Sequence, residues 1–290
     1  MNEVDALERA IVMHARDAFR DERRVAAQWQ ALGFVEPPDV GRAIDEYERL
    51  IEILSAAGAR IDFLPSDEST TLDAIYARDA SVASPRGMIL CRMGKPARAG
   101  EPAAQERAFR ACAAPIPVAG SIEPPGQVEG GDVVWFDEQT LAVGRGYRTN
   151  AEGIRQLRAL LGDRITVIEV PLPHWRGTGD VMHLMSLISP VDRDLAVVYS
   201  PLMPVPFREW LLERGMQLVD VPDEEFATMG TNVLALAPRR CLVLAGNPRA
   251  RAALERAGAA VLEYEGREIS VKGAGGPTCL TRPITRRNRV

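Results

Sequence analysis

The sequence predicts an α/β protein in which one supersecondary unit occurs five times around a closed ring. Runs of strand length alternate with amphipathic segments of helical period along most of the 290 residues. The same order of strand, polar turn, hairpin and helix recurs. The polar residues that begin the hairpins are 53, 51, 49 and 47 residues apart, at Asp79, Asp132, His183, Asn232 and Cys279. A period of about fifty residues indicates an array of units, and five units favour a ring over an open sheet.

Two helices are expected before the first unit. Residues 3–32 place apolar residues at helical spacing between charges, and the segment EPPD at 36–39 ends that run. Residues 41–58 form a second amphipathic pattern that ends at Gly58. We therefore predict an N-terminal helical extension over residues 1–35 and a single α/β domain over residues 36–290.

The units themselves follow from apolar hairpins and the helices after them. Hairpins are expected at 80–93, 132–144, 184–200 and 233–246, with helices near 101–112, 150–161, 206–214 and 247–257. The fifth unit begins at Cys279, and the eleven residues that follow it leave no room for a helix. We expect the helix at 41–58 to complete the fifth unit and close the ring, which leaves fewer open sheet edges.

Composition narrows the classes of function. The formal net charge of −5 and the pI near 5.5 give no basic surface for nucleic acid or an anionic membrane, so we expect a small-molecule partner. Four cysteines without a CxxC pair indicate a reducing compartment, and the acidic start and the lack of a long apolar run predict a cytoplasmic protein. The three histidines are not spaced for zinc, so we expect neither a metal nor a cofactor.

Cys279 is the candidate nucleophile. Glycines and a proline surround it in GAGGPTCLTRPI, residues 273–284, which lets it lie at the tip of a turn. The alternative is a small buried apolar side chain, as most free cysteines are. If the five hairpins surround one axis, Cys279 meets His183 and the carboxylates of Asp79, Glu129 and Asp132. A thiol, an imidazole and a carboxylate can act as nucleophile, proton carrier and orienting base, and several acids suit a cationic substrate.

These segments carry a resemblance to a known superfamily. YARDASV (76–82), EGGDVVWFDEQTLAVGRGYRTNAEGIRQL (129–157), MHLMSLISPVDRDLAVVYSP (182–201) and GGPTCLTRPI (275–284) resemble the guanidino-group-modifying enzymes. These include dimethylarginine dimethylaminohydrolase, arginine deiminase and the amidinotransferases, and the similarity runs from about residue 60 to 285. It implies a five-bladed α/β propeller, or pentein, with pseudo-fivefold ββαβ repeats around a central active site.

The resemblance also implies a role for each matching residue. Cys279 would attack the guanidinium carbon, His183 would protonate the leaving amine and then activate water, and Glu129 would hold and polarise the site. The substrate-binding residues would be Asp79 on the guanidinium, Arg148 and Arg98 on the α-carboxylate, Asp73 near the α-amino group, and Asp132. Asp132 has an alternative role as a structural turn acid. Hydrolysis of the S-alkylthiouronium intermediate would release citrulline.

Two features of the sequence point to different members of the superfamily. The deiminases and amidinotransferases have an aspartate two residues after the histidine, where this chain has Met185, as suits a substituted and partly apolar guanidinium. Arg78 before Asp79 and the ending around Cys279 look more like arginine deiminase. We therefore expect hydrolysis of Nω-methylated arginine, with arginine deiminase, an amidinotransferase and a non-catalytic arginine-binding module as the alternatives. A dimer contact through the first helix is a further expectation.

Overall fold

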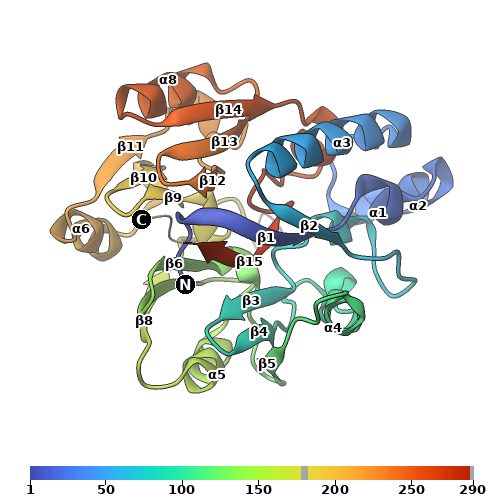
Figure 1. Ribbon diagram of the computed structural model, residues 1–290, viewed down its shortest axis with the longest axis horizontal. Helices are drawn as coiled ribbons and strands as arrows, with labels where there is room; N and C mark the ends of the chain where they lie inside the picture. Colours follow the sequence, from blue (N-terminus) through green and yellow to red (C-terminus); the bar gives the residue numbers. More distant parts are fainter. Residues whose placement is uncertain (178–181, 288–290) are drawn as a thin grey trace.

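The computed structural model describes residues 1–177 and 182–287, and its strands form five three-stranded sheets (Figure 1). In each sheet the first two strands are antiparallel and the third lies parallel to the middle one. The first four sheets contain β3 (Ser81–Ser84), β4 (Gly87–Leu90) and β5 (Val118–Ser121); β6 (Val133–Asp137), β7 (Thr140–Arg145) and β8 (Thr166–Pro171); β9 (Ile188–Asp192), β10 (Leu195–Val198) and β11 (Gln217–Asp220); and β12 (Leu234–Ala237), β13 (Arg240–Leu244) and β14 (Ala260–Tyr264). The fifth contains β15 (Arg282–Arg287), β1 (Ala6–Val12) and β2 (Arg60–Phe63).

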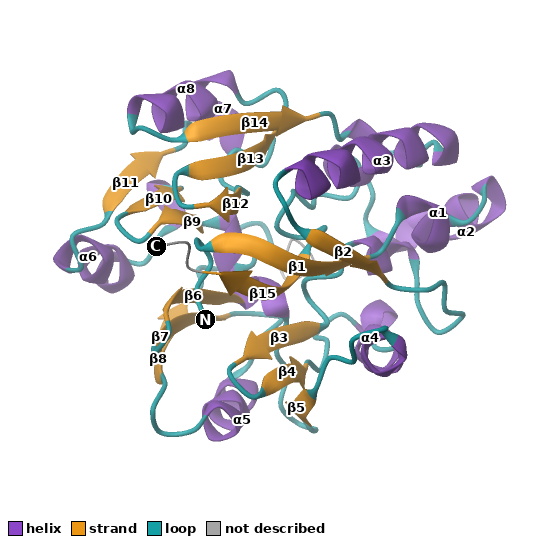
Figure 2. Cartoon of the chain, in the orientation of Figure 1, coloured by secondary structure: helices purple, strands orange, loops and turns teal. Residues whose placement is uncertain are grey.

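One helix joins the second and third strands of the first four sheets, and in the fifth a long helix does so after two further helices, so each unit keeps the ββαβ order that the sequence predicted. These helices are α4 (Glu101–Ala111), α5 (Ala151–Leu161), α6 (Val205–Glu213), α8 (Pro248–Arg256) and α3 (Val40–Ala56). They lie on the outside of the sheets in Figure 2. Helix α5 begins where the side chain of Asn150 accepts a hydrogen bond from the Gly153 amide (2.8 Å), and it buries Ile154 and Leu157. The Asn150 cap therefore fixes the start of this helix, and the amphipathic pattern fixes its inner face.

The single helix predicted over residues 3–32 is wrong. The chain instead forms strand β1, then α1 (Ala15–Phe19) and α2 (Glu22–Leu32), with His14 and Asp21 as N-caps. Strand β1 is the middle strand of its sheet, antiparallel to β15 and parallel to β2. Its neighbours on both sides satisfy its backbone and cover its side chains, and these tertiary contacts override a pattern that reads equally well as a helix. The first residues are thus part of the fifth sheet and not a helical extension.

The fifth unit joins the two ends of the chain. Strand β15 is followed in space by β1, and α3 then leads to β2, so the helix at 41–58 does complete the unit that begins at Cys279. Figure 1 shows the blue β1 beside the dark red β15, with α3 above them. This pairing explains how a sheet forms where the sequence offers only one late strand.

Hydrogen bonds link each sheet to the next and the fifth to the first. They join Trp135 Nε1 to Ala83 O (3.1 Å), the Leu184 amide to Asp132 Oδ1 (3.0 Å), the Arg239 amide to Val191 O (3.1 Å), Arg286 Nη1 to Ala235 O (2.8 Å) and Arg282 Nη1 to Ser81 O (2.8 Å). Units that are consecutive in the sequence are therefore neighbours in the fold, and the fifth unit is also a neighbour of the first.

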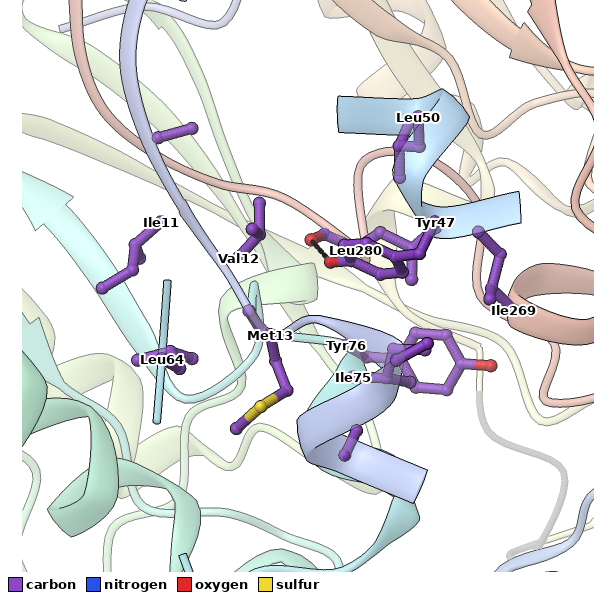
Figure 3. Packing of buried hydrophobic residues seen from close by; sticks show 14 of the residues in the cluster. Ile11, Val12, Met13, Tyr47, Leu50, Leu64, Ile75, Tyr76, Ile269 and Leu280 are labelled. Carbon is purple, nitrogen blue, oxygen red and sulfur yellow. Dashed lines mark hydrogen bonds between the residues drawn. The ribbon is translucent and has the colours of Figure 1, made fainter. Parts of the chain in front are cut away.

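The largest apolar cluster supports the turn that carries Cys279. Tyr47 from α3 packs beside Leu280 and Ile269, and its hydroxyl donates to Leu280 O (3.3 Å; Figure 3). Tyr47, Leu50 and Leu280 are fully buried. Burying a side chain of this size contributes about 1.5–3 kcal/mol, so helix α3 anchors the residue directly after Cys279.

No helix in residues 1–177 and 182–287 has the length and apolar character needed to cross a membrane.

Candidate active site

Five candidate residues lie in the turns that precede the first strands of four of the five sheets. Asp79 precedes β3, Glu129 and Asp132 precede β6, His183 precedes β9, and Cys279 precedes β15. One carboxylate oxygen each of Asp79 and Glu129 and one ring nitrogen of His183 all lie within 4.8 Å of one another. The turns of three different units therefore meet at one place.

His183 forms the closest contact in this group. Its Nε2 lies 2.8 Å from Glu129 Oε2. Burial lowers the pKa of His183, but the charges of Asp79 and Asp132 and the bond to Glu129 outweigh it, so the pKa rises to about 9. The imidazole is therefore protonated at neutral pH and can act as an acid.

Glu129 is fully buried and its carboxylate is saturated with donors. Oε1 accepts from the amides of Gly94 (2.9 Å) and Lys95 (3.1 Å), and Arg148 Nη1 lies 3.0 Å from Oε2. Burial raises the pKa of Glu129, but the bond and charge of His183 and the charges of Arg98 and Arg148 lower it further than burial raises it. Glu129 thus remains ionised and holds the His183 ring in place.

Gly131 allows Asp79 and His183 to approach each other. A Cβ on this glycine would lie 2.7 Å from Asp79 Oδ1 and 2.8 Å from His183 Nδ1, which is closer than any real contact. The Gly131 amide donates to Asp79 Oδ1 at 2.9 Å. The second glycine of EGGD is therefore required by the site, because any side chain there would push the imidazole and the carboxylate apart.

Cys279 faces an amide donor from the fourth unit. Asn232 Nδ2 lies 3.2 Å from Sγ, while Asn232 Oδ1 accepts from the amide (3.0 Å) and the hydroxyl (2.7 Å) of Thr278. These two donors fix the orientation of the Asn232 amide with its NH₂ toward the sulfur. Burial and the charge of Asp79 raise the pKa of the Cys279 thiol, and the Asn232 bond opposes them.

Asp79 connects the thiol with the imidazole. Its charge acts on the pKa values of both Cys279 and His183, and the Arg78 amide, one residue earlier, donates to Cys279 O (3.1 Å). The group of Asp79, Glu129 and His183 is therefore close enough to Cys279 for the charge of Asp79 to act on the thiol as well as on the imidazole.

Arg98 does not present a free guanidinium to a substrate carboxylate. It is buried, and its Nη1 lies 2.6 Å from Asp79 Oδ2. Its Nε and Nη2 both bond Glu101 at 2.8 Å, and Nη2 also donates to Tyr76 O (3.0 Å). All of its nitrogens are engaged, so Arg98 positions Asp79, which corrects the expected role on the α-carboxylate.

Asp132 has contacts that fit the structural role given as its alternative in the sequence analysis, although its side chain does not bond its own turn. Its Oδ1 accepts from the Leu184 amide (3.0 Å) and its Oδ2 from the Thr149 hydroxyl (2.6 Å). Burial raises the pKa of Asp132 to about 6. It therefore joins the His183 turn to the segment before α5, which corrects the expectation of a substrate-binding residue.

Arg148 and Asp73 lie at the edge of the same site. Arg148 reaches Glu129 through Nη1, and its side chain is partly buried. Asp73 Oδ2 lies 2.7 Å from Lys95 Nζ, and Lys95 also donates to Leu32 O (2.7 Å). Lys95 was not among the sequence-based candidates. It comes from a loop without a motif, and only the fold brings it beside Glu129.

Asn232 and Thr149 were also absent from the predicted site. Asn232 is one of the five residues that begin the hairpins, so the repeat in the sequence could have indicated it. The sequence offers no indication of Thr149 beyond its position after Arg148. Of the described residues, Asp79, Glu129 and His183 form the one group with the spacing of a metal site. Arg98 and Arg148 already compensate the two carboxylates of this group.

Similarity to known proteins agrees with this arrangement. The family model described as N,N dimethylarginine dimethylhydrolase, eukaryotic, matches residues 39–286. The chain is 30% identical over 218 residues to N(G),N(G)-dimethylarginine dimethylaminohydrolase of Streptomyces coelicolor, covering 74% of this chain and 75% of that one. It is 27% identical over 248 residues to the enzyme of the same name from Pseudomonas aeruginosa, with 84% and 89% covered.

The fold is shared more widely. The N-terminal domain of ArgZ, a cyanobacterial arginine dihydrolase, superposes with a TM-score of 0.80 at 18% identity, covering 96% of this chain and 97% of that domain. The family model spans most of the chain and includes all five turns of the site. The chain therefore belongs to the N,N-dimethylarginine dimethylhydrolase family, whose hydrolases act on amidines.

Proposed function

We propose that the protein hydrolyses an Nω-methylated arginine to citrulline and methylamine or dimethylamine, with Cys279 as the nucleophile. The observation that carries this proposal is the meeting of Asp79, Glu129 and His183 beside a thiol that receives a hydrogen bond from Asn232. An imidazolium near a nucleophilic thiol and an ionised carboxylate suits acyl-type transfer at a cationic carbon.

We place this chemistry at the centre of a five-bladed α/β propeller. Its support is the series of hydrogen bonds that runs from sheet to sheet and returns through Arg282 to Ser81 in the first sheet. Both ends of the chain enter the same fifth sheet, where β15 pairs with β1. A ring of this kind directs its five turns toward one axis.

Asp79 is the proposed guanidinium ligand because it keeps free acceptor capacity. Its Oδ1 accepts one bond from Gly131 and its Oδ2 one from Arg98, and each carboxylate oxygen can accept two. Glu129, in contrast, receives two amides on Oε1 and contacts both His183 and Arg148 through Oε2. One edge of a guanidinium, with two N–H groups, fits Asp79.

A guanidinium bound at Asp79 would activate the thiol. Burial keeps the free Cys279 thiol protonated by raising its pKa, and a neighbouring cation favours the thiolate. The thiol proton passes to solvent, the thiolate adds to the guanidinium carbon, and the C=N electron pair moves to nitrogen until the C–N bond to the departing amine breaks. His183, with a pKa of about 9, carries the proton that the departing amine needs, since an amine leaves as a neutral molecule only after it is protonated.

The second half of the reaction uses the same imidazole. Once it has given up its proton, the neutral His183 can accept one from a water molecule that attacks the thiouronium carbon. The C–S bond then breaks, the electron pair returns to sulfur, and citrulline is released. Glu129 holds the ring in both steps through the 2.8 Å bond to Nε2.

The preference for a methylated substrate follows from the number of acceptors. Arginine brings five N–H groups, whereas asymmetric dimethylarginine brings three. The Asp79 carboxylate has two free acceptor positions, so arginine would bury more donors without partners, at about 1–3 kcal/mol each. Met185 itself packs in an apolar cluster with Leu184 and Ile188. Its effect on substrate choice is therefore only that this position offers no second carboxylate to the guanidinium.

The amino acid end of the substrate is assigned to the edge of the site. We propose that Asp73 binds the α-amino group and that Lys95 and Arg148 bind the α-carboxylate. The supports are the 2.7 Å contact between Asp73 and Lys95 and the contact of Arg148 with Glu129, which place one acid and two cations beside the reacting centre.

The test is a substrate panel. Citrulline production is measured with arginine, monomethylarginine and asymmetric dimethylarginine at equal concentrations, with Cys279→Ser as the control that should give no product. We expect the highest kcat/KM with the methylated substrates. Equal kcat/KM for all three would contradict the selectivity argument, and a higher value for arginine would make the protein an arginine deiminase.

A further inference from the structure

A buried group of arginines lies behind the catalytic turn. Arg78, Arg282 and Arg286 surround the carboxylate of Glu3, and we call these four residues the arginine cluster. Arg78 is 1% exposed and Arg282 is 3% exposed, although both carry a full charge. Arg78 Nη2 lies 2.7 Å from Glu3 Oε1. The side chain of Arg78 therefore binds Glu3, whereas the side chain of the next residue, Asp79, belongs to the candidate active site. The proposed reaction uses no member of this cluster.

The cluster has hydrogen-bond donors without acceptors. Nε and Nη1 of Arg78 and Nε and Nη2 of Arg286 are buried and have no partner within the described chain, residues 1–177 and 182–287. Arg282 donates only to carbonyl oxygens, the closest being Ser81 O at 2.8 Å. Unpartnered buried donors of this kind are rare in folded proteins, because each costs about 1–3 kcal/mol.

The charges of the cluster are unbalanced as well. Three guanidinium groups face the one carboxylate of Glu3. The nearby Asp5 compensates Arg286 only in part, because its carboxylate also contacts Asn2 (2.7 Å) and Arg193 (3.2 Å). Burial and the charge of Arg78 lower the pKa of Arg282 to about 9, and burial lowers that of Arg286 to about 10. The three buried guanidinium groups of the cluster therefore outnumber the nearby carboxylates of Glu3 and Asp5.

A cavity adjoins Arg282 and Arg286, whereas Arg78 is not in its lining. It has a volume of about 140 Å³, and its lining includes Asn2, Glu3, Trp135, Arg282, Thr285 and Arg286. A small oxyanion with its first waters fits into this volume, since one water occupies about 30 Å³ of liquid. Three acids of the lining, Glu3, Asp5 and Glu138, would oppose an anion, and Glu138 lies at the exposed rim.

We propose that this cavity binds a small oxyanion, with phosphate as its model, through the guanidinium groups of Arg282 and Arg286. Planar guanidinium groups bind tetrahedral oxyanions through paired N–H bonds, and the anion would supply both the missing acceptors and the missing negative charge. Arg78 would stabilise it through charge. Since the Arg78 amide bonds Cys279 O and its carbonyl accepts from Arg282 Nη1 (3.4 Å), the anion would also support the catalytic turn from behind.

The experiment is a titration of the protein with inorganic phosphate by calorimetry, at constant ionic strength and with citrulline saturating the catalytic site. Arg286→Gln removes two unpartnered donors and one charge, so it should weaken phosphate binding at least about tenfold. Glu3→Gln removes the competing carboxylate, so it should strengthen binding. The matched control is Arg287→Gln, whose partner Glu8 is on the surface and outside the cluster, and which should leave binding unchanged.

The two variants have opposite expected signs, which separates this cavity from any other phosphate site. Thermal unfolding with and without phosphate repeats the comparison and shows whether each variant is folded. If Arg286→Gln does not fold, tighter binding by Glu3→Gln still supports the proposal. No phosphate binding by the unaltered protein, or unchanged affinity in Glu3→Gln, would overturn it. No turnover is measured, and the opposite signs are expected from residues outside the catalytic site, so the two outcomes can be read even if citrulline does not bind there.

Discussion

Replacing Asn232 by alanine should raise the pKa of the Cys279 thiol. The Asn232 amide is the side-chain N–H donor within hydrogen-bond distance of Sγ, at 3.2 Å, and its orientation is fixed by Thr278. A hydrogen bond to a charged acceptor contributes about 1.5–3 kcal/mol. One pKa unit corresponds to about 1.36 kcal/mol, so losing this bond should raise the thiol pKa by about 1–2 units.

The assay is the pH dependence of alkylation of Cys279 by iodoacetamide, followed by mass spectrometry of the modified peptide. The rate reports the thiolate fraction and requires no substrate. Cys241 is an internal control, because burial raises its pKa to about 12 and it should stay unmodified. Thr278→Val is the matched variant: it removes the hydroxyl that donates to Asn232 Oδ1 but keeps the amide that also does, so a smaller shift is expected.

Asn232→Asp adds a test of sign. A carboxylate near the sulfur replaces a donor by a negative charge, so it should raise the thiol pKa more than alanine does. If the alkylation profile of Asn232→Ala coincides with that of the unaltered protein, the bond to Sγ does not stabilise the thiolate, and the assignment of Asn232 fails. A normal profile with lost turnover would instead indicate that Asn232 contacts the substrate.

Three further outcomes are expected. Arg98→Ala should lower the free energy of unfolding by about 3–5 kcal/mol in urea denaturation, because Asp79 and Glu101 lose their buried partner; an unchanged midpoint would contradict this. Lys95→Met should raise KM about tenfold with little effect on kcat, whereas a fall in kcat alone would exclude a role in binding the amino acid end. The free energy of unfolding should fall as pH rises through about 9, since the pKa of His183 is raised from 6.5 to about 9 on folding. The contribution of His183 to stability is complete below pH 6.5. His183→Gln should remove this loss, as measured by thermal unfolding at a series of pH values.

The repeat in the sequence was sufficient to predict the five units and the turns that hold the site. Hairpin starts recur at nearly constant spacing because each unit has the same strands and helix, and the same spacing marked Asn232. The place of α3 in the fifth unit followed from counting which unit lacked a helix. These predictions depended on local patterns and on their period, both of which the sequence displays directly.

Strand β1 could not be predicted in the same way. Residues 6–12 contain apolar and charged residues in an order that fits a helix face or a two-sided strand. What decides between them is β15, which lies at the other end of the sequence and pairs with β1. A contact across nearly the whole chain leaves no trace in a local window, so periodicity alone gives the wrong element here.

The contacts of the arginines could not be predicted from the sequence for a similar reason. Arg98 and Arg148 are both near motif residues in the sequence. Only the fold shows that Arg98 binds Glu101 and Asp79, whereas Arg148 lies at the edge of the site. Likewise, Arg78 beside Asp79 resembled an arginine deiminase feature. In the structure its side chain bonds Glu3, so it says nothing about the substrate at the catalytic centre.

The charges of the site also explain how a substrate and its product could be distinguished. In the free protein, burial and Asp79 both keep the Cys279 thiol protonated. In the proposed reaction, a guanidinium bound at Asp79 would cancel that negative charge and favour the thiolate, so the nucleophile would form when a cationic substrate is present. Citrulline carries a neutral ureido group and cannot do this. Once this product had formed, the thiol would regain a proton from solvent and the attraction to Asp79 would weaken, so release would be favoured over a second attack on the same carbon.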